Sequence, residues 1–216
     1  MNVDPLSRLS PMRLTLLILA AFLVGCDGGT STPTIVGSGN TSTQAVEPDT
    51  RRTEVVEPDT RPTFVLDASK PFVIEFGRGS GQHGLDIVKV NETGAVQLSR
   101  IEGRPNAEFA SLQLSSTDVA TLVGLVNTNQ LTSMGRMYSD PRMADGTQWV
   151  LWIEQSPFQK SIYFNNFFPD EITAFESGLD ALLQKAGSGT AMWSPLPRQQ
   201  AMDQQKALWG RIEPAR

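Results

Sequence analysis

The spacing of apolar residues divides the middle of the chain into short strands. Residues 72–76 (FVIEF) and 85–90 (LDIVKV) are rich in β-branched and aromatic side chains, which favour extended structure. The tetrad NETG at 91–94 then turns the chain into 95–101, so we expect a hairpin at this point. A partial alternation of apolar and polar residues over 109–114 predicts a fourth strand.

A change of period after residue 114 predicts the first helix. Ser115, with Asp118 three residues later, has the layout of a capping box in which Asp replaces Glu, so we expect the helix to begin at this pair. Apolar residues then recur at i, i+3, i+4 and i+7, which places them on one helical face. They are Val119, Leu122, Val123 and Val126.

The second half of the chain predicts another hairpin and another helix. Residues 147–154 and 160–165 are the expected strands, and 155–159 join them. Pro169 suits the first position of a helix, and the acidic residues that follow it complement the helix dipole. The apolar stripe of this helix comprises Ile172, Phe175, Leu179, Leu182 and Leu183.

Both faces of the strand at 147–154 carry apolar bulk, because aromatic and aliphatic residues occupy successive positions. One face should pack against the helices. The other face needs a cover, which the segment 191–193 or a short helix over 199–209 could provide. We prefer this interpretation to an open aromatic surface.

The element order β-β-β-β-α-β-β-α, with mainly short turns between strands, predicts an α+β fold. We expect a single domain over residues 64–187, with an antiparallel sheet of about six strands and two helices packed on one face. A domain of this length supports one hydrophobic core. Residues 188–216 are expected to form a C-terminal tail with at most a short docking helix.

Residues 26–63 have the composition of a linker. Gly, Ser, Thr and Pro dominate the first half, which cannot bury enough apolar surface to offset the entropy of folding. The hexapeptide VEPDTR occurs at 46–51 and again at 56–61. Two copies are too few for a solenoid, so we interpret the repeat as a spacer stiffened by proline rather than as a binding motif.

Residues 1–25 have the organisation of a secretory signal. Arginines precede an apolar run over 14–24, and this run is too short to span a bilayer. The tetrad Leu23-Val24-Gly25-Cys26 resembles the lipobox of bacterial lipoprotein signal peptides, and Cys26 is the only cysteine in the sequence. The resemblance covers residues 1–26.

This resemblance implies cleavage between Gly25 and Cys26, a diacylglyceryl thioether on Cys26, and further acylation, for example with palmitate, of the new amino terminus. Two or more acyl chains attach a protein stably to a membrane. The implied location is the bacterial cell envelope, with the domain facing the periplasm or the exterior. Asp27 favours the inner membrane in enterobacterial lipoproteins but not in other lineages, so the choice of membrane stays open. The alternative is an ordinary secretory signal with an incidental cysteine.

Composition and charge narrow the class of protein further. The 216-residue chain has 39% hydrophobic and 19% charged side chains, which suits a soluble globular domain. Its 23 acidic residues exceed its 18 basic residues, which argues against nucleic acid as a partner. One cysteine and one histidine cannot supply a disulfide framework or a Cys/His metal cluster, and we expect neither a metal nor a cofactor.

The glycine-rich stretch at 77–84 contains Arg78, Ser80 and His83, which are polar groups of the kind that anion sites use. A phosphate loop opens a helix, whereas a strand follows here, so we interpret the stretch as a flexible hairpin loop. His83 is the only imidazole base, and with Ser80 and Asp86 nearby it makes an envelope hydrolase the catalytic alternative. No Gly-x-Ser-x-Gly motif supports this alternative.

The layout of residues 70–185 resembles that of a group of small uncharacterised bacterial lipoprotein-borne domains. The shared features are the hairpin with its NETG turn, the LSSTD start of the first helix, a loop with Asp145-Gly146, the Trp-rich hairpin and the closing helix. The resemblance supports the predicted fold but implies no catalytic or binding residue.

Our preferred site is the loop at 134–143, because exposed Met, Arg and Tyr are enriched at protein interfaces and loops carry binding residues. Its candidate binding residues are Arg136, Met137, Tyr138 and Arg142. No set of catalytic acid, base and nucleophile is evident, so we expect a non-catalytic binding or adaptor module whose partner is another envelope protein. A second alternative is an inhibitor-like lipoprotein that occupies the cleft of its partner.

Overall fold

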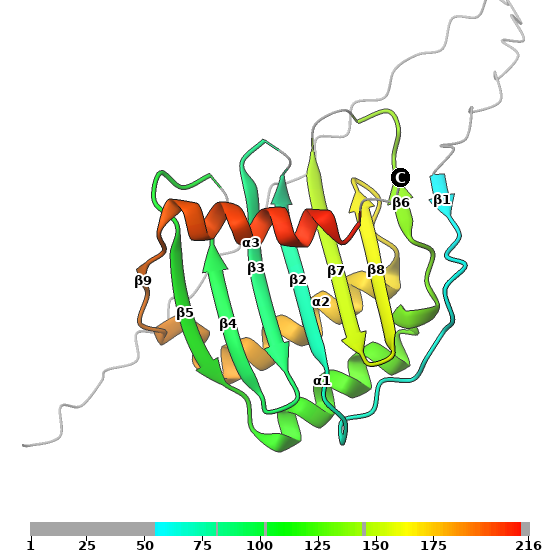
Figure 1. Ribbon diagram of the computed structural model, residues 1–216, viewed down its shortest axis with the longest axis horizontal. Helices are drawn as coiled ribbons and strands as arrows, with labels where there is room; N and C mark the ends of the chain where they lie inside the picture. The colour runs from blue at the N-terminus through cyan, green and yellow to red at the C-terminus, as the bar shows by residue number, and fades with distance from the viewer. Residues whose placement is uncertain (1–54, 81, 102, 144–145, 213–216) are drawn as a thin grey trace, which may run out of the picture. The chain divides into compact units, whose positions relative to one another are not determined.

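The computed structural model describes residues 55–80, 82–101, 103–143 and 146–212 (Figure 1). The predicted signal segment, Cys26 and the first VEPDTR copy lie outside this part of the chain. The strands are β1 (Val55–Glu57), β2 (Val73–Ser80), β3 (Gly84–Asn91), β4 (Ala95–Arg100), β5 (Glu108–Gln113), β6 (Met137–Ser139), β7 (Thr147–Gln155), β8 (Phe158–Asn165) and β9 (Ser194–Pro195). The helices are α1 (Ser116–Thr128), α2 (Asp170–Lys185) and α3 (Arg198–Gly210), with the short 3-10 helices η1 (Leu131–Ser133) and η2 (Ser188–Thr190).

The described strands form one nine-stranded sheet in the order β1-β6-β8-β7-β2-β3-β4-β5-β9. Neighbouring strands are antiparallel except β6 and β8, which run parallel. The α+β class is confirmed, but the prediction of about six antiparallel strands is wrong in strand number and in direction. The additional strands β1, β6 and β9 are only two or three residues long, which is too short for an alternating pattern to be visible.

Helices α1 and α2 pack on one face of the sheet, and the principal core lies between them and the strands (Figure 1). Ile74 and Phe76 of β2 are buried there, and the ring of Phe76 meets that of Phe175 edge-on with the centroids 5.6 Å apart. The apolar stripes predicted for both helices are buried. Ser115 caps α1 as predicted, because its Oγ accepts the Asp118 N–H at 3.2 Å.

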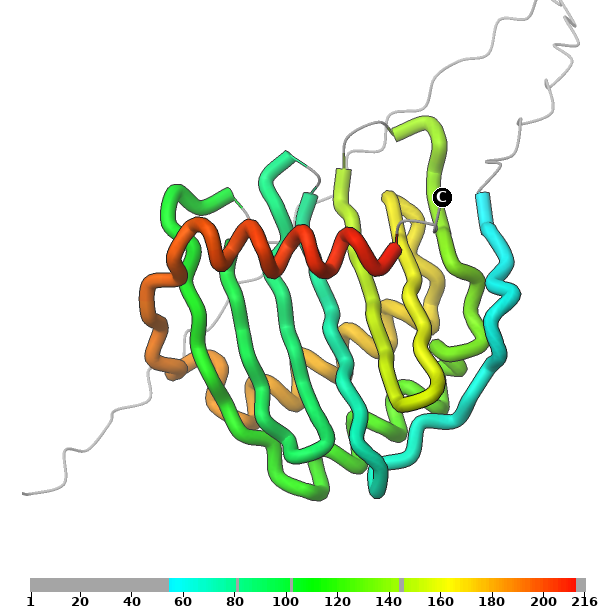
Figure 2. Tube along the Cα trace, in the orientation of Figure 1, coloured from blue at the N-terminus to red at the C-terminus, as the bar shows by residue number. Residues whose placement is uncertain are grey.

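Helix α3 crosses the opposite face of the sheet (Figures 1 and 2). The helix over 199–209, one of the two covers predicted for this face, is therefore confirmed, while α1 and α2 share the other face as predicted. Leu208 of α3 is fully buried. It belongs to a second apolar cluster with Leu85, Ile87, Val150 and Trp152. Gly77 permits this close approach, because a Cβ at that position would lie 2.7 Å from Leu208 Cδ2. Helix α3 is therefore the cover that the apolar pattern of β7 requires.

The glycine-rich stretch is mostly strand rather than flexible loop. Residues 77–80 complete β2, and Gly84 begins β3, with which β2 forms the predicted hairpin. Arg78 reaches α2 on the other face of the sheet, where it pairs with Glu176 and Asp180 at 2.7 and 2.8 Å. The glycines thus allow α3 to approach one face while Arg78 binds the helix on the other.

The folded domain extends beyond both predicted limits. Strand β1 lies at the start of the second VEPDTR copy and pairs with β6, so residues 55–63 belong to the domain and not to the spacer. At the other end, β9 pairs with β5 and α3 packs on the sheet, which takes the domain past residue 187. The composition of residues 55–63 and 188–212 does not show that they belong to the domain, because the segments they pack against lie far away in the sequence.

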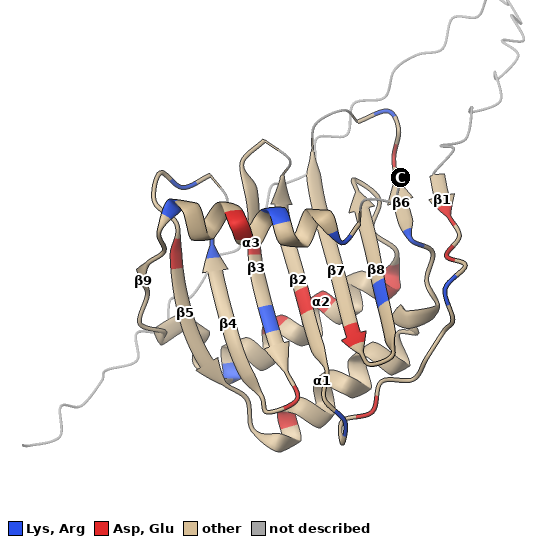
Figure 3. Ribbon diagram, in the orientation of Figure 1, with Lys and Arg blue, Asp and Glu red and all other residues tan. Residues whose placement is uncertain are grey.

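Charged residues of both signs are interspersed over the described elements (Figure 3). Under the end of α3, Glu75 is 7% exposed and pairs with Lys89 and Arg211 at 2.9 and 2.7 Å. The pair with Arg211 ties the end of α3 to the centre of the sheet, and the pair with Lys89 joins β2 to β3. Of the helices that the structure describes, none has both the length and the apolar content to cross a bilayer.

Candidate functional site

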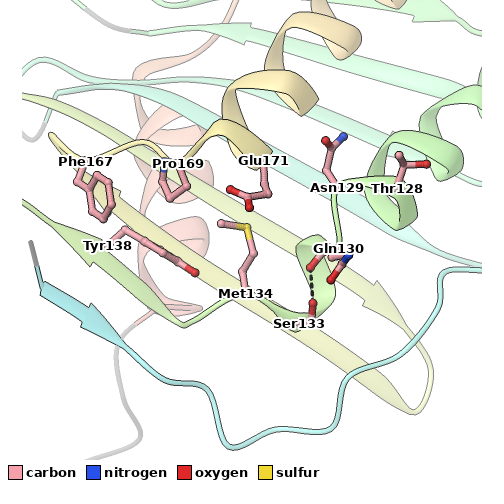
Figure 4. A pocket seen from close by; sticks show the side chains of 9 residues that line it. All are labelled: Thr128, Asn129, Gln130, Ser133, Met134, Tyr138, Phe167, Pro169 and Glu171. Atoms are coloured by element: carbon pink, nitrogen blue, oxygen red, sulfur yellow. Dashed lines mark hydrogen bonds between the residues drawn. The ribbon is translucent and has the colours of Figure 1, made fainter.

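An open pocket of about 560 Å³ lies between the end of α1, the 3-10 helix η1, strand β6 and the start of α2 (Figure 4). A pocket of this size accommodates a small molecule or a side chain of a partner. It is formed by two stretches of chain, 128–138 and 167–171. Its lining residues are Thr128, Asn129, Gln130, Ser133, Met134, Tyr138, Phe167, Pro169 and Glu171.

The apolar wall of the pocket is mainly aromatic. Tyr138 stacks on Phe164 with a centroid distance of 5.4 Å and an interplanar angle of 18°, and it meets Phe167 at 5.8 Å. The phenol oxygen of Tyr138 accepts the Gly135 N–H at 2.9 Å. Met134, which is 8% exposed, adds a polarisable thioether to this wall. These contacts fix the orientation of the tyrosine before any ligand binds.

The polar wall is built by the turn that ends α1. The backbone N–H and the side-chain Nδ2 of Asn129 both donate to Leu125 O, at 3.2 and 2.8 Å. Gln130 has a left-handed backbone with φ of 50°, which turns the chain into η1. Ser133 Oγ donates to Gln130 O at 2.7 Å. These bonds hold the amide and hydroxyl groups of the turn beside the pocket.

Glu171 is the only charged residue among those that line the pocket. It lies in the first turn of α2, where the helix dipole favours a carboxylate. Figure 4 shows its carboxylate turned toward Met134, on the side of the pocket where Pro169 and Tyr138 also lie. A carboxylate near the rings of Tyr138 and Phe167 can bind an ammonium or guanidinium group, through charge-assisted hydrogen bonds and cation–π attraction.

The structure separates the four residues that the sequence predicted as a binding site. Tyr138 lines the pocket. Arg136 instead pairs with Glu57 at 2.5 Å, and Met137 lies in β6 between β1 and β8. Arg142 pairs with the aspartate two residues before it, at 2.7 Å. The predicted loop therefore contributes one chosen residue to the pocket and two to the edge of the sheet.

Sequence reasoning missed Asn129, Phe167 and Glu171 as candidate site residues. Each has an ordinary local role, as a helix cap, an apolar residue and an acid in the first turn of a helix. Met134 did lie within the predicted loop but was not chosen. The pocket arises only where the end of α1 approaches the start of α2, which no local pattern reports.

The histidine of the hydrolase alternative lies in the connection between β2 and β3. Ser80 Oγ is 3.0 Å from His83 Nδ1 and also accepts the His83 backbone N–H at 3.1 Å. Asp86 Oδ1 accepts the backbone N–H of Ile101 at 2.6 Å. The structure thus brings Ser80 and His83 together within one exposed turn and gives Asp86 a contact with the backbone.

A buried ion pair lies beneath the chain that follows β1. Lys160 Nζ in β8 is 2.9 Å from Asp59 Oδ2, and the two side chains are 3% and 6% exposed. Lys160 also donates to the Met134 carbonyl, and Arg61 contacts the same carboxylate at 2.7 Å. Burial alone would raise the pKa of Asp59, but hydrogen bonds from Arg61 and Lys160 outweigh it and hold that pKa well below its usual range. Burial lowers the pKa of Lys160.

Within the described ranges, no group of three or more His, Cys, Asp or Glu side chains could hold a metal ion. The chain matches no model of a known protein family, and a comparison with curated protein sequences found no match.

Proposed function

We propose that the protein is a lipid-anchored binding module of the bacterial cell envelope, and that its pocket holds a basic side chain of a partner protein. The anchor rests on the lipobox resemblance of Leu23-Val24-Gly25-Cys26, which assigns the lipid to Cys26. The binding role rests on the pocket. The observation that carries it is the carboxylate of Glu171 in the same pocket as the rings of Tyr138 and Phe167.

The shape of the pocket favours a side chain that projects from a larger partner. An open pocket leaves the rest of the ligand in contact with the surrounding surface. The apolar stem of a Lys or Arg can lie along Tyr138 and Met134 while its charged head reaches Glu171, because these side chains combine a long stem with a cationic end. The amides and hydroxyls of the polar wall can accept the remaining N–H groups.

Binding is better supported than catalysis by the described residues. A serine hydrolase needs the histidine to act on the serine while a third group orients it. Here the contact between Ser80 and His83 is part of a local turn, and Asp86 accepts a backbone N–H. The pocket itself is lined by amides, hydroxyls, apolar groups and one carboxylate, without a histidine or cysteine. The hydrolase stays the alternative.

The pocket is tested with Nα-acetyl-lysine methylamide as the probe and the norleucine analogue, which lacks the ammonium group, as its neutral counterpart. We expect the lysine probe to shift the NMR signals of Tyr138 and Phe167, because both rings line the pocket. Glu171→Gln should weaken this binding about tenfold, since it removes a charge-assisted hydrogen bond.

The matched control for this test is Glu154→Gln, which alters an exposed carboxylate of β7 away from the pocket. It should leave the affinity for the lysine probe unchanged. Equal shifts with the norleucine probe, or equal affinity in wild type and Glu171→Gln, would contradict recognition of a cation.

The anchor is tested separately by the intact mass of protein extracted from membranes, beside a Cys26→Ala variant. We expect a mature chain that begins at Cys26 and carries acyl groups, and we expect the variant to lack them. An unacylated chain in the soluble fraction would refute the anchor and leave the pocket proposal in place.

A further inference from the structure

The second VEPDTR copy is seated along the edge of the sheet, where it begins as an added strand. Val56 lies opposite Tyr138 in antiparallel register, and Glu57 O accepts the Arg136 N–H at 2.7 Å. The Glu57 carboxylate also pairs with the Arg136 guanidinium at 2.5 Å. Figures 1 and 2 show this segment in cyan beside β6. An added strand binds through its main chain and gains specificity from its side chains.

The remaining charged side chains of the seated copy also have partners on the domain. Asp59 pairs with Lys160 at 2.9 Å, with both side chains buried. Arg61 donates to both the carbonyl oxygen and Oγ of Ser161 at 3.1 Å. If Asp59 left, the Lys160 ammonium would keep the Met134 carbonyl as its acceptor but lose its counter-ion. The site therefore requires a carboxylate at the fourth position of the motif.

The first copy, at 46–51, carries the same six side chains in the same order. Because the two hexapeptides are identical, the contacts that β6 and β8 make with the hexapeptide cannot distinguish one copy from the other. The residues after the two copies differ. The third residue after the second copy is Phe64, which is buried and stacks on Phe158 with a centroid distance of 5.4 Å. The third residue after the first copy is Glu54. The contact of Phe64 favours the second copy as the occupant, whereas the first copy offers the same six side chains without that contact.

We propose that the site on β6 and β8 binds either copy of the same chain, so that docking the first moves the attachment point ten residues toward the N-terminus. Phe64 would stay seated, and residues 52–61 would form a loop, whose entropic cost grows only slowly with length. Covalent linkage supplies the first copy at a high effective concentration, which favours exchange within one chain. If Cys26 carries the lipid, as proposed above, the exchange shortens the tether, but the exchange itself does not depend on lipidation.

The test is amide hydrogen exchange in the full-length protein, read by mass spectrometry on peptides from each copy. In the wild type we expect protection at 55–57. Asp59→Ala removes the carboxylate from the second copy and should transfer protection to 45–47, with exchange there slowed at least about tenfold. Asp49→Ala is the matched control, because it makes the same substitution in the same motif, and it should leave 55–57 protected.

The double variant Asp49→Ala/Asp59→Ala should leave both segments exchanging rapidly, as should Lys160→Met, which removes the shared partner. Slow exchange in β7 shows that each variant is folded. The proposal is overturned if 45–47 exchanges as fast in Asp59→Ala as in the double variant. Protection of 45–47 that rises with protein concentration would also overturn it, since it indicates capture from a second molecule. Lipidation does not enter this readout, so failure of the exchange is distinct from failure of the anchor.

Discussion

Replacing Lys160 with methionine tests whether the buried ion pair holds the edge of the sheet. The substitution keeps most of the side-chain length and removes the ammonium group. It leaves the Asp59 carboxylate with Arg61 as its remaining charged partner, and it removes the donor from the Met134 carbonyl. Breaking a buried ion pair from one side lowers the free energy of unfolding by about 3–5 kcal/mol.

Two features of the structure reduce this loss. Arg61 still contacts Asp59 at 2.7 Å, but its side chain is 32% exposed, so solvent screening limits its compensation. The segment around β1 can also detach locally from the sheet and return Asp59 to water. The loss of unfolding free energy therefore cannot exceed the free energy with which this segment binds the sheet. We therefore expect a loss of about 3 kcal/mol, which corresponds to a Tm lower by about 6–12 °C.

The measurement is urea unfolding at neutral pH, with the midpoint and slope compared between variants. The double variant Lys160→Met/Asp59→Leu replaces the pair by apolar side chains and should lie within about 1 kcal/mol of the wild type. A loss below about 1 kcal/mol for Lys160→Met, or a double variant no more stable than the single one, would refute this account of the pair.

The pKa of Asp59 is lowered in the folded protein, so its contribution to stability is present at neutral pH and is lost as pH falls below about 4, toward the folded pKa. The Tm of an Asp49→Asn/Asp59→Asn variant should therefore depend less on pH in this range, and an unchanged dependence would contradict the assignment. Gly77→Ala should lower stability by about 1–3 kcal/mol in thermal unfolding, because its Cβ would lie 2.7 Å from a leucine of α3. Gly124→Ala is its control, since no atom lies within 4 Å of that Cβ, and it should raise stability by about 0.5–1 kcal/mol; equal effects would argue against tight packing of α3. His83→Ala should leave binding of the lysine probe unchanged, and turnover that survives this substitution in any hydrolase assay would exclude the catalytic alternative.

Local sequence patterns were sufficient for the longer elements of the fold. The strands β2 to β5, β7 and β8 and the helices α1 and α2 lie close to the positions that apolar spacing predicts. Helix α3 was only a candidate, because Ala201 and Leu208 are its only buried residues and they make no continuous stripe. The strands β1, β6 and β9 were missed, because two or three residues carry no measurable period.

Of the four residues that the sequence analysis chose as candidate binding residues, only Tyr138 lines the pocket. Tyr138 was found because methionine, arginine and tyrosine gather in the loop at 134–143, which is a property of composition. Phe167 and Glu171 follow β8 and have no local feature that connects them with this loop. Only the packing of α2 beside the end of α1 places them in one pocket.

Lys160 shows most clearly what the sequence determines and what it leaves to the tertiary structure. In the sequence it is one polar residue of a strand, and the hexapeptide that covers it has the composition of a spacer. Periodicity and capping act between near neighbours, so local patterns were enough to locate most strands and helices. The edge on which the hexapeptide lies, the charges that are buried and the side chains that share the pocket all follow from how the elements pack together. These features depend on pairing between distant segments, which leaves no local signature in the chain.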